Sequence, residues 1–364
     1  MVSLRFCFCF FLFCASNVIL IPNKSLAKTC PPRQHKALFV FGDSLFDVGN
    51  NNYINTTDQA NFAPYGEKFF KYPSGRFTNG RVIPDFIAEF AKLPLIQPYL
   101  FPGNRDYIDG INFASGGAGA LVETNQGLVI DLKTQLSYFK RVIKVLRQER
   151  GDAETKSLVA GAVYLISIGS NDYLGPLSQN SSIISSYSPE KYVDMVIGNL
   201  TTVIKEMHNQ GGRTFGFVNL GPLGCTPLVK ALLNGSEGLC REEVSSIVNL
   251  HNTALLVELQ KLEKQLKGFK YSVLNFYDVG FDVISHPSKY GFKEASEACC
   301  GSGPYRGYYN CGGKGYELCK NATEYVFFDA VHPTEGAYEI FSQFIWNGNH
   351  TITGPYNLKA LFQL

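Results

Sequence analysis

The chain has 364 residues, of which 45% are hydrophobic and 18% charged, and its formal net charge is +2. This composition is typical of a globular protein with a large core. Because there is no long basic or acidic block, neither nucleic acid nor an anionic membrane surface is indicated as a partner.

The N-terminal segment has the pattern of a secretory signal peptide. Arg5 precedes an apolar stretch over residues 6–15, and residues 25–27 (Ser-Leu-Ala) offer small side chains at the two positions that a signal peptidase reads. The alternative is a membrane anchor, but Ser16 interrupts an apolar run that is shorter than a bilayer span. We therefore predict a signal peptide over residues 1–27, secretion to the extracellular space, and no integral membrane association.

Short apolar runs then alternate with amphipathic helical patterns. The runs are near-continuously apolar and end in Gly, Asn or Asp, which is typical of parallel strands buried on both faces. They span residues 37–41, 162–168, 214–220, 271–277 and 325–328. Helical spacing of apolar residues covers residues 132–146, 193–204 and 244–266, and glycine follows the last two patterns.

This alternation predicts an α/β fold, a three-layer α/β/α sandwich with a parallel sheet. No Pro- or Ser-rich linker divides residues 28–364, so we predict a single domain there. In open parallel sheets, sites form beyond the carboxyl ends of the strands. Ser44, Asn171 and Asp329 all follow predicted strands.

Ser44 is the leading candidate for a nucleophile. The first apolar run breaks into Gly42-Asp43-Ser44, and a serine at the rigid end of a buried strand can be held in attack geometry. The alternative is a plain polar turn. A serine also needs a base to take its proton, and His332 follows Asp329 by three residues directly after the last run. One short loop would thus present a base and the acid that orients it.

The other five histidines are interpreted as cap, core or loop residues. Acyl transfer also requires donors for the oxyanion, and two segments offer them: Asn171 in a Gly-Ser-Asn turn, and the small-residue loop over residues 112–119. No G-x-S-x-G elbow, P-loop, G-x-G-x-x-G, H-E-x-x-H or metal-ligand constellation occurs in the sequence. Leu121, Val122, Leu174 and Leu223 are either core residues or the lining of an acyl pocket.

Seven cysteines remain after the signal peptide, and in an oxidising compartment we expect disulfides. Cys225 and Cys240 are predicted to form a local bridge. The last four cysteines are predicted to form two more bridges, with the pairing left open: Cys299, Cys300, Cys311 and Cys319. Zinc is the alternative for these four, but their spacing contains no C-x-x-C pair. The odd count leaves one free thiol, for which Cys30 is the candidate.

Sequons agree with secretion. The predicted glycosylation sites are Asn55, Asn180, Asn199, Asn234, Asn321 and Asn349. Asn199 differs from the others because it lies inside a strongly helical pattern.

Four blocks in order resemble the GDSL family of serine esterases and lipases, also called SGNH hydrolases. They are residues 41–45 (Phe-Gly-Asp-Ser-Leu), the loop over 112–119, residues 169–172 (Gly-Ser-Asn-Asp) and residues 329–333 (Asp-Ala-Val-His-Pro). Their extended forms look like the secreted plant branch, and the chain also resembles a plant subgroup linked to pathogen defence. The resemblance covers essentially all of residues 37–364.

The resemblance implies a flavodoxin-like sheet and a metal-free hydrolase without a cofactor. Carried over block by block, Ser44 is the nucleophile, His332 the base and Asp329 its partner. The oxyanion donors implied are the Ser44 N–H, Asn171 and a glycine of the second block, with Gly117 favoured and Gly116 as the alternative.

The leading hypothesis is a secreted hydrolase that cleaves carboxylic esters of lipids, or other acyl esters, through an acyl-enzyme on Ser44. Two alternatives remain open. One is an acyltransferase or polysaccharide deacetylase that uses the same site, and the other is a catalytically silent signalling glycoprotein.

Overall fold

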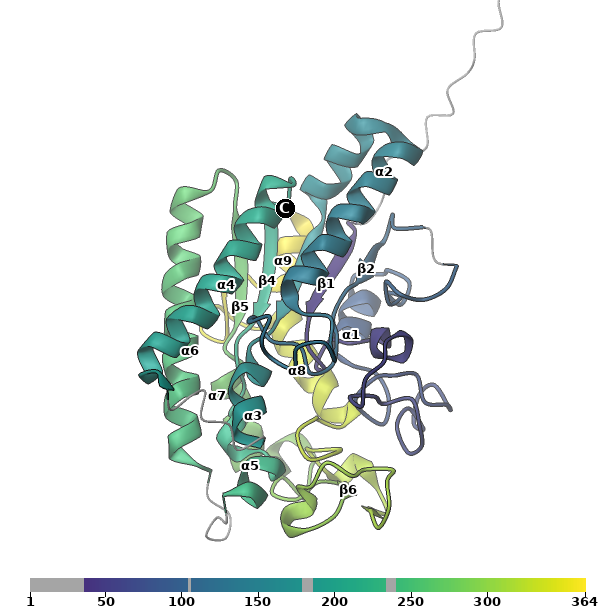
Figure 1. Cartoon of the computed structure of the whole chain (residues 1–364), viewed down its shortest axis with the longest axis vertical. Helices are drawn as coiled ribbons and strands as arrows, with labels where there is room; N and C mark the ends of the chain where they lie inside the picture. The colour runs from purple at the N-terminus through teal and green to yellow at the C-terminus, as the bar shows by residue number, and fades with distance from the viewer. Residues whose placement is uncertain (1–35, 104–105, 179–185, 234–239) are drawn as a thin grey trace, which may run out of the picture. The chain divides into compact units, whose positions relative to one another are not determined.

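The computed structural model describes residues 36–103, 106–178, 186–233 and 240–364. A six-stranded sheet with the order β2-β1-β3-β4-β5-β8 carries the fold (Figure 1). The strands are β1 (Leu38–Gly42), β2 (Gly110–Asn112), β3 (Val163–Ser167), β4 (Thr214–Val218), β5 (Lys270–Leu274) and β8 (Thr353–Pro355). β1 to β5 are parallel and β8 pairs antiparallel with β5. The order 2-1-3-4-5 is that of flavodoxin-like sheets, which confirms the predicted parallel flavodoxin-like architecture.

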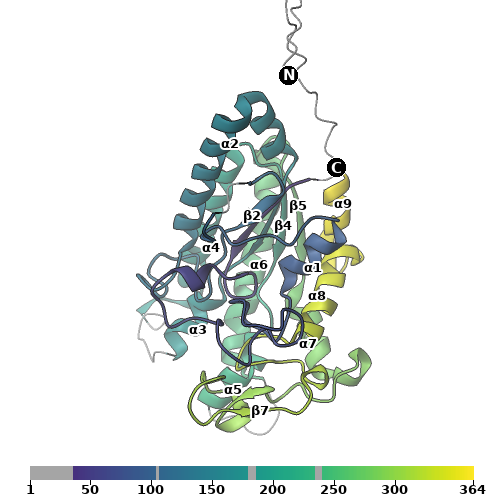
Figure 2. The same cartoon turned by 90° about the vertical axis from the view of Figure 1, so that its right-hand side faces the viewer.

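Two cores lie on opposite faces of this sheet, because successive side chains of a strand point to opposite sides. In β1, Phe39 and Phe41 face one core, and Leu38 and Val40 face the other. The first core is covered by α2 (Leu132–Gly161), α3 (Ser170–Ser178), α4 (Pro189–Asn209), α5 (Pro227–Leu232) and α6 (Glu242–Gln265). The second is covered by α1 (Ile83–Phe90), α7 (Phe276–Ser285), α8 (Glu335–Asn347) and α9 (Leu358–Gln363). Figure 2 shows the sheet between these two helical layers, so the predicted three-layer sandwich is confirmed.

The three predicted helical patterns correspond to α2, α4 and α6. α4 illustrates how the local sequence sets its bounds. Ser188 accepts the Lys191 N–H at 3.2 Å as an N-cap, and Pro189 occupies the first turn, where its missing N–H costs nothing. The pair Gly211 and Gly212 then follows the last turn.

The predicted strand over residues 325–328 is wrong. This segment alternates isolated bridges with bends, and its backbone groups are used outside the central sheet. Phe327 and Phe328 accept the N–H groups of Cys299 and Cys300 at 3.0 and 2.7 Å, and the Phe328 N–H donates to the His332 carbonyl at 2.7 Å. The segment therefore pairs with a disulfide-bonded loop and with its own following turn. The sequence-based prediction also missed the two three-residue edge strands, β2 and β8.

The four C-terminal cysteines form the bridges Cys299–Cys319 and Cys300–Cys311, and Cys225 pairs with Cys240 as predicted. Two short strands, β6 (Cys300–Gly301) and β7 (Glu317–Leu318), lie within the segment that the first two bridges close. In the part of the chain that the structure describes, no helix is long and apolar enough to cross a bilayer.

From Lys36 onward the described residues belong to one compact unit. The predicted signal peptide, Cys30 and the sequons at Asn180 and Asn234 lie outside the described residues. Asn55, Asn321 and Asn349 are exposed, and Asn199 lies on an exposed position of α4.

Candidate active site

Ser44 stands two residues beyond β1 on a rigid edge of the sheet. Gly42 ends the strand with φ +151°, and a Cβ at this position would collide with the carbonyl oxygen of Ser167 in β3. Glycine therefore allows the two strands to stay paired up to the turn. The Asp43 N–H donates to the same carbonyl at 3.1 Å. The Gln135 side chain binds both backbone groups of Gly42, at 2.9 and 2.8 Å, so the turn that carries Ser44 is held from both sides.

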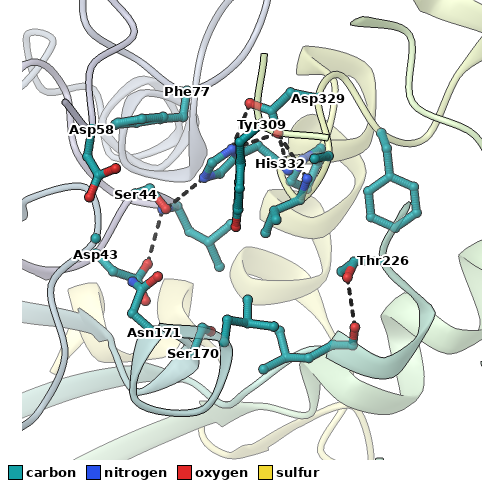
Figure 3. A pocket seen from close by; sticks show the side chains of 18 of the residues that line it. Asp43, Ser44, Asp58, Phe77, Ser170, Asn171, Thr226, Tyr309, Asp329 and His332 are labelled. Atoms are coloured by element: carbon teal, nitrogen blue, oxygen red, sulfur yellow. Dashed lines mark hydrogen bonds and ion pairs between the residues drawn. The ribbon is translucent and has the colours of Figure 1, made fainter. Parts of the chain in front are cut away.

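The structure brings together the three residues that the sequence singled out for acyl transfer (Figure 3). The Ser44 hydroxyl lies 2.7 Å from Nε2 of His332, and Nδ1 of the same ring lies 2.8 Å from each carboxylate oxygen of Asp329. Exposure is 9% for Ser44, 7% for His332 and 4% for Asp329. Water therefore competes little with these hydrogen bonds. The contact between Ser44 and His332 joins segments 288 residues apart in the sequence.

The charge of Asp329 determines which nitrogen of His332 carries the ring proton in the hydrogen-bonded chain from Ser44 to Asp329. Burial alone would raise the pKa of Asp329, but the charge of His332 and the hydrogen bonds from His332 and from the Val331 N–H hold it below its ordinary value. The carboxylate is thus ionised and can only accept hydrogen bonds. It follows that Nδ1 of His332 carries the ring proton, which leaves Nε2 free to accept the proton of Ser44.

Two aromatic residues that the sequence analysis missed support this relay. The Tyr65 hydroxyl donates to Oδ2 of Asp329 at 2.8 Å, and the Phe77 ring lies 4.9 Å from the His332 ring with a tilt of 36°. Tyr65 is itself buried among rings, with Phe62 and Phe328 at 5.4 and 5.3 Å. No local sequence pattern marks Tyr65, because it is separated from Asp329 by 264 residues.

The loop over residues 112–119 contains two candidate glycines for the oxyanion, and only Gly117 lies at the cavity that opens over Ser44. The N–H of Gly116 donates to the carboxylate of Asp47 at 3.0 Å, so it is already used. Gly117 lines the cavity beside Ser44 with φ +79°. Among the described residues, no group accepts the N–H of Gly117 or of Ser44. Both donors are therefore available to a substrate oxygen.

Asn171 is the second residue of helix α3, which follows β3, and it lines the same cavity. Its side-chain amide donates one hydrogen to the Ala118 carbonyl at 3.0 Å, which leaves its second hydrogen for another acceptor. The neighbouring Asp172 is buried and ties α3 to the second block, since it accepts the Ala120 N–H at 2.8 Å and the Thr124 hydroxyl at 2.6 Å. Burial raises its pKa to about 6, against the effect of these hydrogen bonds.

A cavity of about 460 Å³ opens over Ser44. This volume is in the range of ligand pockets in proteins. Leu121, Leu174 and Leu223 all belong to the first core, and of these Leu174 and Leu223 also line the cavity. Much of the remaining wall is apolar and comes from Leu45, Phe276, Gly280, Ile284, Phe327 and Phe341. In the described residues, no group of three or more His, Cys, Asp or Glu side chains is placed to hold a metal ion.

Comparison with known proteins identifies the family of the chain. The family model of the GDSL-like Lipase/Acylhydrolase matches residues 38–345. The chain belongs to this family. It is 51% identical to GDSL esterase/lipase 1 of Arabidopsis thaliana, covering 96% of this chain and 93% of that protein. It is 50% identical to the GDSL lipase of Tanacetum cinerariifolium, covering 91% and 89%.

Among solved structures, a lipase from a goat-rumen metagenome is similar with a TM-score of 0.35 and 15% identity, covering 85% of this chain and 94% of the other. The family assignment therefore rests on the sequence matches. As a GDSL-type protein with these relatives, the chain is a carboxylic-ester hydrolase, and its substrate is an acyl ester or lipid.

The cavity of this GDSL-type hydrolase is partly walled by the disulfide-bonded segment. Tyr308, Tyr309 and Cys311 from this segment line the cavity, and Gly312 packs against Phe62 of the loop that carries Asp58. The bridges Cys299–Cys319 and Cys300–Cys311 anchor it at its base. The four cysteines whose pairing the sequence left open thus anchor a segment that contributes to the wall of the site.

Proposed function

We propose that the chain hydrolyses carboxylic esters of lipids through a covalent acyl-enzyme on Ser44, with His332 as the base and Asp329 as its partner. The observation that carries this proposal is the unbroken hydrogen-bond relay from Ser44 Oγ through His332 to Asp329, at 2.7 and 2.8 Å.

The reaction proceeds in two halves. His332 Nε2 takes the proton of Ser44 as Oγ attacks the ester carbonyl, and the negative charge develops on the carbonyl oxygen. The N–H groups of Ser44 and Gly117 and the Asn171 amide serve as donors to this oxygen. His332 then gives its proton to the leaving alcohol. Water, deprotonated by the same imidazole, attacks the acyl-enzyme. The bond between the acyl carbon and Oγ then breaks, His332 returns its proton to Ser44 and the acid leaves.

A matched pair of serines tests this proposal. Ser44 and Ser170 both line the cavity, and each is 9% exposed. Replacing Ser44 with Ala should lower kcat for a nitrophenyl ester by at least about 1,000-fold, because the nucleophile is lost. Ser170→Ala should stay within a few-fold of the wild type. Equal activity in the Ser44→Ala protein and the wild type would rule out the mechanism.

We also propose that the protein is secreted after cleavage near residue 27, and that it carries N-linked glycans. Three disulfides among the described residues support an oxidising compartment. At the sequons of Asn321 and Asn349, the side-chain oxygen accepts the hydroxyl of the sequon threonine at 2.7 and 2.6 Å on an exposed surface. Sequencing the N-terminus of secreted protein, and measuring its mass before and after deglycosylation, tests both points. A role in plant defence is supported only by resemblance, and infection assays on plants lacking the protein would test it.

A further inference from the structure

The cavity carries a charge imbalance that ester hydrolysis itself does not require. Among the described residues that line it there is no Lys or Arg, whereas Asp43, Asp58 and Asp329 are all present. Asp329 is paired with His332. Asp43 is only 1% exposed, and burial raises its pKa to about 7 against the Leu45 N–H that it accepts. Asp58 is therefore the carboxylate that can present a negative charge to a ligand.

Backbone contacts hold Asp58 beside the second block. The buried Asn51 amide donates to the Asp58 carbonyl at 2.7 Å and to the Gly116 carbonyl at 2.9 Å. A Cβ at Gly117 would collide with Oδ2 of Asp58, so the carboxylate packs directly against this glycine. No group of the described residues donates a hydrogen bond to that carboxylate. Figure 3 shows it directed toward the space beside Ser44.

The chemistry indicates which part of the ester lies near Asp58. The leaving alcohol receives its proton from Nε2 of His332, so its oxygen must lie next to this ring. Asp58 is close to the same ring. Burial raises the pKa of Asp58, and the charge of His332 acts on it in the opposite direction. The alcohol portion of the substrate and the Asp58 carboxylate thus share one side of the cavity.

We propose that Asp58 selects the alcohol portion of the ester by charge, so that cationic alcohols are favoured over neutral ones and anionic alcohols are disfavoured. This inference rests on the proposed function. Two exposed rings on the same rim, Phe62 and Tyr309, offer faces on which a cation is stabilised further. Two charges a few ångströms apart at a partly exposed site change a rate on the order of tenfold per unit of charge.

The test uses three butyrate esters of similar shape and different charge: butyrylcholine (cationic), 3,3-dimethylbutyl butyrate (neutral) and the butyrate ester of 2-hydroxyethanesulfonate (anionic). For the wild type we expect kcat/KM to fall in that order, by about 100-fold from cation to anion, which is about tenfold for each unit of charge. Added salt should reduce the differences in kcat/KM among the three esters, because the rim of the cavity is open to solvent.

Asp58→Asn keeps the shape of the side chain and removes its charge, so the cation-to-anion ratio should fall at least tenfold from its wild-type value. Asp152→Asn is the control, because this carboxylate is 93% exposed and lies outside the cavity. It should leave all three rates unchanged. Should Asp58→Asn fail to fold, the salt dependence in the wild type tests the inference without it.

A wild type that treats the three esters alike would overturn the inference while leaving the proposed function intact. So would an Asp58→Asn protein with the wild-type ratio, or a ratio insensitive to salt. If the wild type cleaves none of the three, including the neutral ester, the proposed function fails and this inference fails with it.

Discussion

Replacing Tyr65 with Phe removes a single hydroxyl from the relay. The hydroxyl donates to Oδ2 of Asp329 at 2.8 Å, and without it Oδ2 keeps only the His332 ring as a donor. Oδ1 retains the N–H groups of Val331 and His332. The rings around position 65 stay packed, so the change is confined to one hydrogen bond.

The magnitude follows from burial and charge. Tyr65 is 6% and Asp329 4% exposed, so water does not readily replace the lost donor. A hydrogen bond to a charged group contributes about 1.5–3 kcal/mol. If the transition state depends fully on this bond, kcat falls by about 10- to 150-fold. Since the hydroxyl is used by Asp329, KM should change little.

The assay measures kcat and KM separately for a nitrophenyl ester. Loss of the Tyr65 hydroxyl removes a donor that holds the Asp329 carboxylate in position against the His332 ring, so kcat should fall while KM stays close to its wild-type value. Tyr309→Phe is the control, because this tyrosine lines the cavity and its hydroxyl has no hydrogen-bond partner among the described residues. A folded Tyr65→Phe protein with the wild-type kcat would refute the reasoning.

Two further predictions concern stability. The folded-state pKa of Asp43 is raised by burial from 3.8 to about 7, so the folded protein holds this proton across that window and loses stability as pH rises through it. Between about pH 4 and pH 7, the free energy of unfolding of the wild type should fall by up to ~4 kcal/mol relative to that of Asp43→Asn, as measured by denaturant unfolding. The same pH dependence of unfolding free energy in both proteins would contradict this. Gly42→Ala should lower the free energy of unfolding by more than ~1 kcal/mol, and by more than Gly127→Ala, which shares a positive φ but has open space around it. Equal losses in thermal melts would argue against the collision with Ser167.

The sequence predicted what is local. Strand ends and short blocks indicated Ser44, Asn171, Asp329 and His332, because each follows an apolar run or belongs to a compact loop. The parallel sheet followed from the same runs. The prediction failed where pairing is decided by distant segments. Residues 325–328 have a strand pattern, but their backbone pairs with the loop at Cys299 and Cys300.

Supporting residues were missed for a related reason. Tyr65, Gln135 and Asp58 reach the site from loops and a helix that have no chemical pattern of their own. Gln135 contacts Gly42 across 93 residues, and Asp58 acts through its position against Gly117. Such contacts depend on the assembled fold, so spacing in the sequence does not reveal them.

Covalent labelling tests the central proposal most directly. A fluorophosphonate reacts with an activated serine, and peptide mass spectrometry then locates the adduct. We predict one label per chain on the peptide that contains Ser44, and loss of labelling in His332→Ala, because Ser44 then has no base. An unlabelled folded protein, or a label on another residue such as Ser170, would contradict the assignment of Ser44 as the nucleophile.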